Sequence, residues 1–335
     1  SIIELYMEMT MRRVHYESFR ASLTKAKLIC LSMLAFAFMI LGNAVASDSA
    51  KDSEAKTQLV DSSLTESLDR SYRRLLPLEG GSNFRDMGGY PSILGGKVKR
   101  GLLFRSGAMT SLTSTDVDYL DQFDFQAVVD LRSSEEVALF PNTWAEISDV
   151  PHLRVDYSIL TMMAAQQDED ASIEEMSDYS EMYRSIHRSI EPQLKLYFET
   201  LLEVNGPVVV NCSAGQDRTG ITSALLLSVL GVGEDQIIED YLLSTDFRRP
   251  EYESGSVDLE AAAETNAFAA MMLRYGTDQD RSRPNPLVTK SGVPFVAYTL
   301  AEVRRNHGSV ENYLINRLGL DRSQIELLRD RYLSK

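Results

Sequence analysis

The stretch from Val208 to Gly220 constrains this chain more than any other part of its sequence. Three consecutive valines follow the turn residues Gly206 and Pro207, and they predict a short buried strand. Residues 221–230 are apolar on nearly every side, which predicts a buried helix. A loop that leads into a helix N-terminus directs several unpaired backbone N–H groups at one spot, where the helix dipole adds positive character. The sequence therefore predicts an anion-binding loop between the strand and the helix.

Two side chains at the ends of this loop indicate its chemistry. Cys212 lies at the base, where a helix N-terminus favours the thiolate form of a cysteine. Arg218 offers a planar guanidinium group, which can bind two phosphate oxygens at once. The alternative is that Cys212 is a structural cysteine and Arg218 a surface arginine, with this spacing by chance. The strand, the glycines and the helix are all in register with the two residues, which makes chance a poor explanation. A Walker-type loop is excluded, because Gly220 is followed by Ile221 and Thr222 where that loop has Lys and Ser or Thr.

The pattern Cys-x5-Arg-Thr-Gly between a buried strand and a buried helix resembles the signature loop of the cysteine-dependent phosphatases. Its fuller form, Cys-x-Ala-Gly-x-Asp-Arg-Thr-Gly, is similar to the bacterial tyrosine, dual-specificity and lipid phosphatase branch. Residues 83–90 are similar to the opening signature of the same branch, and residues 129–133 also match it. The resemblance implies an α/β fold with a mostly parallel central sheet and helices on both faces.

The resemblance also implies a cysteinyl-phosphate mechanism with Cys212 as the nucleophile and Arg218 as the phosphate clamp. A carboxylic acid must protonate the leaving oxygen, and both Asp217 and Asp130 match the branch. Asp217 is favoured slightly as the acid, because its place in the loop guarantees that it lies close to the leaving oxygen. The alternative is an ion pair with Arg218, which would suit a structural role better than proton donation. Asp130 ends a buried strand, where burial would raise its pKa toward the working range of an acid; a helix cap or a partner for Arg132 is the alternative. The expected phosphate-binding or substrate-binding residues are Ser213, Ala214, Gly215, Gln216, Thr219, Gly220, Arg85 and Asp86, and Thr219 could also donate a hydrogen bond to the sulfur.

Two departures from the branch bear on the substrate. Asn211 stands where a histidine usually precedes the cysteine, and Gln216 stands where a lysine is frequent. Such a lysine suits multiply phosphorylated lipids, so its absence favours a protein-tyrosine or dual-specificity phosphatase. The alternatives are a phosphoinositide or other lipid phosphatase and a non-catalytic phosphate-binding module.

Residues 1–46 have the layout of a secretory signal peptide: a basic stretch, an apolar run of 14 residues over 28–41, and an A-x-A site at 44–46. An uncleaved membrane anchor is the alternative, but about 20 apolar residues are needed to span a bilayer. Residues 47–71 are polar and read as a flexible linker, and residues 72–335 as the phosphatase domain. Within it, residues 158–192 predict a helical lid or a plain core helix, and residues 259–273 predict one helix. The expected location is periplasmic or secreted, without stable membrane insertion once the signal is removed.

The remaining motifs and the charge narrow the function further. The sequence has no H-E-x-x-H pattern, no cysteine cluster and no G-x-S-x-G pattern, so neither a metal site, a cofactor nor a serine hydrolase is expected. The formal net charge is −15, and because residues 1–46 carry +2, the rest carries −17. This charge argues against nucleic acid or anionic membranes as partners. The expected partner is a phosphorylated protein or a small phosphoester.

Overall fold

The computed structural model describes residues 74–161, 179–275, 284 and 286–335. The expected signal peptide at 1–46 and linker at 47–71 lie outside the described residues, as does the middle of the expected lid. Within the described residues, no helix has both the length and the apolar character that a membrane span requires.

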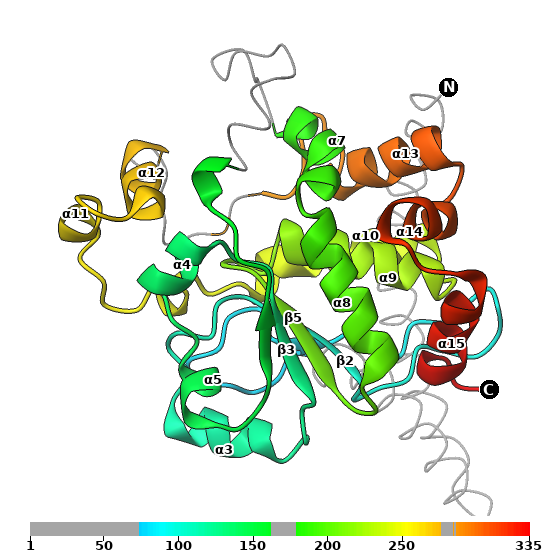
Figure 1. The fold of residues 1–335 in the computed structure, drawn as a ribbon, viewed down its shortest axis with the longest axis horizontal. Coiled ribbons are helices and arrows are strands. Elements are labelled where there is room, and N and C mark those ends of the chain that lie inside the picture. Colours follow the sequence, from blue (N-terminus) through cyan, green and yellow to red (C-terminus); the bar gives the residue numbers. More distant parts are fainter. Residues whose placement is uncertain (1–73, 162–178, 276–283, 285) are drawn as a thin grey trace, which may run out of the picture. The chain divides into compact units, whose positions relative to one another are not determined.

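A five-stranded sheet with the order β1-β2-β5-β3-β4 forms the centre of the fold (Figure 1). β1 is antiparallel to β2, whereas the remaining neighbours are parallel. β5 therefore has a parallel partner on either side and is the strand that leads into the signature loop. The predicted mostly parallel sheet is confirmed. The strands are β1 (Arg85–Asp86), β2 (Leu103–Ser106), β3 (Ala127–Asp130), β4 (His152–Arg154) and β5 (Val208–Asn211).

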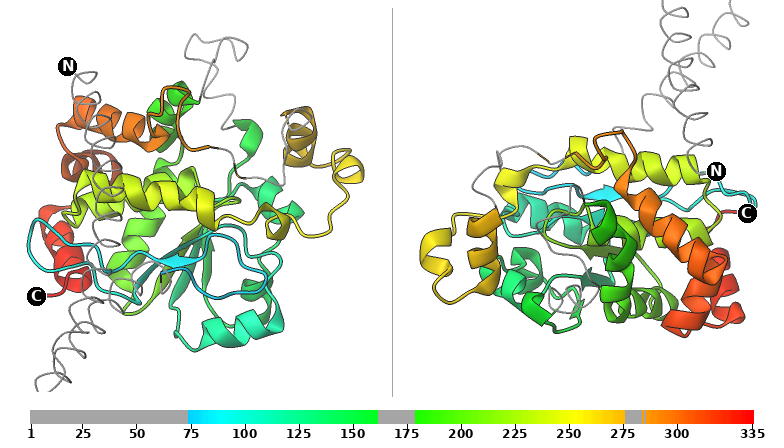
Figure 2. Two further views of the ribbon diagram at one scale, coloured as in Figure 1. Left: turned by 180° about the vertical axis from the view of Figure 1, so that it is seen from behind. Right: turned by 90° about the horizontal axis from the view of Figure 1, so that it is seen from above.

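Alternate residues of β5 pack into separate hydrophobic clusters on the two faces of the sheet. Val208 and Val210 belong to the larger cluster, and Val209 belongs to the smaller one. A strand that is buried on both faces is apolar at every position, which explains why the valine run is continuous. Helices cover both faces, as predicted (Figure 2). The larger cluster includes side chains of α7 (Ser180–Ser189), α8 (Glu191–Glu203), α9 (Arg218–Val229), α10 (Glu234–Phe247), α13 (Phe295–His307), α14 (Val310–Leu318) and α15 (Arg322–Tyr332). The smaller cluster includes side chains of α3 (Ser114–Asp121) and α5 (Thr143–Ile147).

The segment after α10 differs from the prediction. The single helix expected at residues 259–273 is instead two, α11 (Leu259–Ala262) and α12 (Ala267–Tyr275), which follow the 3-10 turn η2 (Pro250–Tyr252). Asn266 explains the break, because its side-chain oxygen accepts hydrogen bonds from the backbone N–H groups of Phe268 and Ala269. Its amide nitrogen donates to the carbonyl of Glu135, the second residue of α4 (Ser134–Leu139), at 2.9 Å.

Candidate active site

The loop after β5 lies at the carboxyl edge of the central strand. Asn211, the last residue of β5, is paired in register with Ser106 of β2 and Asp130 of β3. Cys212 follows directly and is only 2% exposed. α9 begins at Arg218, so six residues connect the strand to the helix. The carboxyl edge of a parallel sheet is where open α/β folds bind ligands, and this loop occupies its centre.

The conformation of the loop is stabilised by hydrogen bonds that its carbonyl groups accept. Asn83 Nδ2 and Arg105 Nη2 each donate a hydrogen bond of 2.9 Å to the carbonyl of Gly215. Gly215 has φ +66°, and a Cβ there would lie 2.6 Å from the carbonyl oxygen of Ser106. Only glycine fits this position. The carbonyl of Ser213 accepts a hydrogen bond of 2.8 Å from the backbone N–H of residue 108.

This arrangement leaves the backbone N–H groups of the loop without acceptors. In the described part of the chain, none of the amides from Ser213 to Asp217 donates a hydrogen bond. Buried or half-buried amides normally have partners, so a run of five without one is a binding feature. A phosphate group satisfies such amides, and the N-terminus of α9 adds favourable charge. The loop therefore has the properties of a phosphate cradle with Cys212 at its base.

Arg218 is fixed beside the loop by Glu136, a residue that the sequence analysis did not identify. Its Nη1 and Nη2 donate to the two carboxylate oxygens of Glu136 at 2.7 and 2.5 Å. Nη1 also donates to Tyr157 Oη at 2.8 Å. Burial by itself would lower the pKa of Arg218, but the carboxylate of Glu136 raises it well above its usual value, so the guanidinium stays charged. The same pair lowers the pKa of Glu136 despite its burial.

The sequence contains one signal for Glu136, but it is local and indicates a helix cap, not a contact with Arg218. Ser133 and Glu136 form a capping box at the start of α4, in which each side chain accepts from the other's backbone N–H. Ser213 Oγ also donates to Glu136 Oε1 at 2.5 Å. Glu136 therefore links the start of α4, the loop and Arg218, which the Ser-x-x-Glu pattern alone could not show.

Replacing Glu136 with glutamine is expected to reduce kcat/KM by about 10- to 100-fold. Each hydrogen bond to a charged group contributes about 1.5–3 kcal/mol, and the neutral amide leaves Arg218 without its counter-charge. Steady-state kinetics on a phosphotyrosine peptide would measure the loss. Glu146→Gln, on an exposed residue of α5, is the matched control. Equal activity of the two variants would show that Glu136 does not position Arg218.

Asp217 is bound by a tyrosine instead of by the neighbouring arginine. Tyr183 Oη donates a hydrogen bond to Asp217 Oδ1, and Tyr241 Oη donates to Tyr183 Oη at 2.6 Å. Among the described residues Asp217 makes no ion pair with Arg218, whose side chain is bound to Glu136. The ion pair that was the structural alternative for Asp217 is therefore not formed among the described residues.

Asp130 lies near the loop, but its environment is the opposite of the one expected. Arg132 binds both carboxylate oxygens, with a shortest distance of 2.7 Å, and His152 Nε2 lies 3.1 Å from Oδ2. Asn211 Nδ2 donates to Oδ1 at 3.2 Å. Burial by itself would raise the pKa of Asp130, but Arg132 and His152 more than offset it and hold the pKa far below its usual value. The expectation of a raised pKa is wrong, and the alternative, in which Asp130 is the partner of Arg132, is the one that the structure shows.

Arg85 and Asp86 also differ from the expectation of substrate contact. Arg85 is fully buried and donates to Asp240 Oδ1, the Asp240 carbonyl and Ser244 Oγ. Burial, together with the charge of Arg105, lowers the pKa of Arg85 to about 10. Asp86 accepts hydrogen bonds from two backbone N–H groups, those of residues 88 and 101. Both charged groups are bound by the chain itself. Arg85 also donates to the carbonyl of Asn83 and shares Asp240 with Arg105, so it supports the two residues that hold the Gly215 carbonyl.

The remaining loop residues have distinct surroundings. Gln216 is 2% exposed, and its Oε1 accepts a hydrogen bond of 2.6 Å from Arg248 Nη1. Glu253 holds the same guanidinium in a bidentate pair, so Arg248 is not simply solvated. Thr219 Oγ1 is buried and has no hydrogen-bond partner among the described residues, so the expected bond to the sulfur is not formed. Gly220 lies against Tyr241, and a Cβ there would approach that ring to 2.8 Å.

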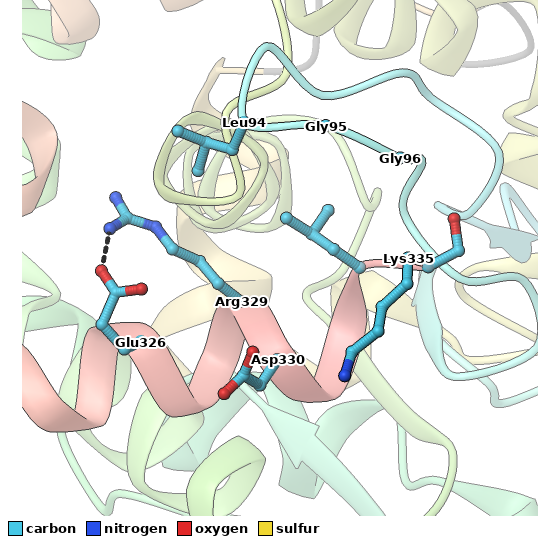
Figure 3. A pocket seen from close by; sticks show the side chains of 9 residues that line it. Leu94, Gly95, Gly96, Glu326, Arg329, Asp330 and Lys335 are labelled. Carbon is cyan, nitrogen blue, oxygen red and sulfur yellow. Dashed lines mark hydrogen bonds and ion pairs between the residues drawn. The ribbon is translucent and has the colours of Figure 1, made fainter.

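Two other cavities lie away from this loop. One of about 490 Å³ is lined by residues 94–96 and the end of α15, where Arg329 pairs with Glu326 (Figure 3). Another of about 440 Å³ is lined by residues around Trp144 and Asp149. Neither is lined by Cys212 or Arg218. Within the described residues, no group of three or more His, Cys, Asp or Glu side chains is placed to hold a metal ion.

Comparison with known proteins agrees with this chemistry. The chain is 26% identical over 291 residues to the triple specificity protein phosphatase PtpB of Mycobacterium tuberculosis, covering 75% of this chain and 96% of that protein. It is 26% identical over 230 residues to a tyrosine-protein phosphatase of Nostoc commune, covering 68% of this chain and 72% of that protein. A family model described as the tyrosine phosphatase family matches residues 76–334, which is nearly the whole described domain. The chain therefore belongs to the tyrosine phosphatase family, and it is a phosphatase.

Proposed function

We propose that this phosphatase hydrolyses phosphotyrosine and other phosphate monoesters of proteins through a cysteinyl-phosphate intermediate. The observation that carries the proposal is the position of Cys212 under five loop amides without acceptors, with Arg218 fixed beside them by Glu136. Residues 212–218 thus bring together a nucleophile, backbone N–H donors for phosphate oxygens and a guanidinium cation, which are the groups that phosphoryl transfer requires.

In the first step the sulfur of Cys212 attacks phosphorus in line. The S–P bond forms while the bond from phosphorus to the leaving oxygen breaks. The loop amides and Arg218 bind the equatorial oxygens as negative charge develops on them. Asp217 gives its proton to the leaving oxygen, so the product departs as an alcohol or phenol.

In the second step water attacks the phosphorus of the intermediate. Asp217, now a carboxylate, takes a proton from this water, and the S–P bond breaks to release inorganic phosphate and the thiolate. Asp217 is the better candidate acid because the carboxylate of Asp130 is bound by Arg132 and kept ionised. Asp130 instead holds the end of β5 through its hydrogen bond with Asn211.

The surroundings of Gln216 favour protein substrates with a single phosphate group. Gln216 is neutral, and the nearby cation Arg248 has its charge balanced by Glu253. The net charge of −15 adds no general attraction for polyanionic head groups. Phosphoinositides are the second candidate class, because the signature loop resembles a branch that includes lipid phosphatases. A panel of phosphotyrosine, phosphoserine and phosphoinositide substrates separates these classes.

Replacing Gln216 with lysine is expected to raise the ratio of phosphoinositide to phosphotyrosine activity by about 3- to 10-fold, because a charge at the loop contributes about 0.5–1.5 kcal/mol toward additional phosphates. Initial rates on both substrates at one ionic strength would measure the ratio. Gln216→Met, which keeps the length without the charge, is the control. A wild-type enzyme that already prefers phosphoinositides, with a ratio that the lysine does not change, would overturn the substrate ranking.

We also propose that residues 1–46 direct export, on the basis of their basic, apolar and A-x-A segments. To test this, the mass of the protein recovered from periplasmic and culture fractions would be measured. A mass that lacks residues 1–46 is expected. Full-length protein found solely in the cytoplasmic fraction would contradict it.

A further inference from the structure

Two tyrosines outside all the recognised motifs form a hydrogen-bonded series that ends on Asp217. Tyr241 of α10 donates to the hydroxyl of Tyr183, and Tyr183 of α7 donates to Asp217 Oδ1. Both side chains are 1% exposed. Three elements that are separate in sequence therefore meet at this carboxyl group: α7, α10 and the loop before α9.

The surrounding packing holds Tyr183 in one position. Its ring is stacked on Phe295 of α13, with centroids 5.3 Å apart and planes at 21°. Thr299 Oγ1 donates a hydrogen bond of 2.5 Å to the carbonyl of Tyr183, which fixes the backbone of α7 at this residue. The ring of Tyr241 packs edge-on against Tyr183 at 6.2 Å. Since its own hydroxyl receives the bond from Tyr241, Tyr183 directs its hydrogen at Asp217.

Gly220 of the signature motif makes this arrangement possible. A Cβ at Gly220 would lie 2.8 Å from Tyr241 Cδ2, so any side chain there would displace the Tyr241 ring. The glycine thus does more than allow the turn into α9, because it lets a tyrosine from α10 lie against the first turn of that helix. The motif and the two tyrosines are one packed unit.

Both phenols remain hydrogen-bond donors throughout the neutral range. Burial, followed by the nearby Asp217 carboxyl group, raises the pKa of Tyr183 well above its ordinary value. The same two causes raise the pKa of Tyr241. Neither hydroxyl ionises under working conditions, so the direction of the two hydrogen bonds is preserved.

We infer that Tyr183, oriented by Tyr241, is a positioning residue for the general acid of this enzyme. The inference rests on the proposed function, in which Asp217 protonates the leaving oxygen. Because Tyr183 engages Oδ1, the transferable proton resides on Oδ2, the oxygen that is free to face the substrate. The phenol also stabilises the carboxylate that remains after the proton has left. A carboxyl group without this bond would rotate, and its proton would be misplaced in many encounters.

The test compares Tyr183→Phe with wild type on phosphate esters whose leaving groups differ in basicity. The variant is expected to be about 10- to 100-fold slower on alkyl or tyrosyl phosphates, and within about 2-fold on an activated aryl phosphate that leaves unprotonated. Tyr241→Phe should slow the alkyl and tyrosyl phosphates in the same way, by a smaller factor. Tyr197→Phe is the matched control, since that phenol is equally buried and its hydroxyl has no partner among the described residues.

A double-mutant cycle with Asp217→Asn completes the test. If Tyr183 acts through Asp217, adding Tyr183→Phe to Asp217→Asn causes little further loss on any substrate. An equal slowing of all substrates by Tyr183→Phe, or additive losses in the double variant, would overturn the inference. A wild-type protein without turnover would instead overturn the proposed function, whereas an Asp217→Asn variant without leaving-group dependence would overturn the role of Asp217 as the acid and the inference with it. Melting temperatures of the full chains show whether each variant is folded.

Discussion

The Cys212→Ser variant should bind phosphate analogues but turn over essentially no substrate. Serine keeps the shape of the side chain, so the amides of residues 213–217 and the Arg218–Glu136 pair stay in place to bind an oxyanion. Its hydroxyl is far less acidic than a thiol, so the nucleophile is lost. The expected fall in kcat is on the order of 10⁴-fold or more, as for the loss of other covalent nucleophiles. Single-turnover kinetics measures the loss, and vanadate titration by calorimetry measures the retained binding.

The chain supplies its own control for this experiment. Cys30 is the only other cysteine in the sequence and falls within the expected signal peptide. Cys30→Ser should keep full activity and stay sensitive to a thiol reagent, whereas covalent labelling of the phosphatase domain by that reagent should disappear in Cys212→Ser. The wild-type enzyme is expected to work unchanged in a chelator. Turnover by Cys212→Ser near the wild-type rate, or wild-type activity that a chelator removes, would refute the covalent, metal-free mechanism.

The parts of the site that the sequence predicted are those encoded by neighbouring residues. The valine run, the glycines and the apolar helix are contiguous, so the strand, the loop and α9 follow from local patterns. Gly215 is an example, because its positive φ is a property of one backbone position. The parallel sheet with helices on both faces could also be predicted, because a strand that is apolar on both faces must be packed against other elements on each face.

The parts that were missed depend on contacts between distant segments. Glu136 lies 82 positions from Arg218, and Tyr183 lies 34 positions from Asp217. A charged or phenolic side chain gives no sequence signal of what it will contact across the fold. For Glu136 the Ser-x-x-Glu pattern indicates only a helix cap, which is a local function of the same carboxylate.

A different kind of error occurred where burial was given more weight than a neighbouring polar or charged partner. Asp130 is as buried as its strand position implied, yet Arg132 reverses the direction of its pKa shift. Arg85 is likewise buried, but Asp240 and Ser244 occupy the guanidinium that was expected to face the substrate. Resemblance to a motif locates such residues near a site without deciding which of them contact the ligand.

The Asp217→Asn variant should be severely slowed on substrates with basic leaving groups and almost unaffected on activated ones. Asparagine keeps the size of the side chain and can still accept the hydrogen bond from Tyr183, so only the transferable proton is removed. Loss of a general acid costs about 10²- to 10⁴-fold on alkyl and tyrosyl phosphates. An activated aryl phosphate departs as a stable anion and should keep its rate within a few-fold. The alkaline limb of the rate profile should also flatten, because that limb reports ionisation of the acid.

Asp130→Asn provides the contrast that makes this result decisive. Removing the Asp130 charge leaves Arg132 buried beside a neutral amide, and breaking a buried pair in this way costs about 3–5 kcal/mol of stability. The melting temperature should therefore fall, while the activity of the folded fraction decreases by a similar factor on every substrate. If Asp130→Asn shows the leaving-group dependence and Asp217→Asn slows all substrates equally, Asp130 is the acid. The ion pair with Arg132 makes that outcome unexpected, because a carboxylate held ionised by a bidentate guanidinium has no proton to give.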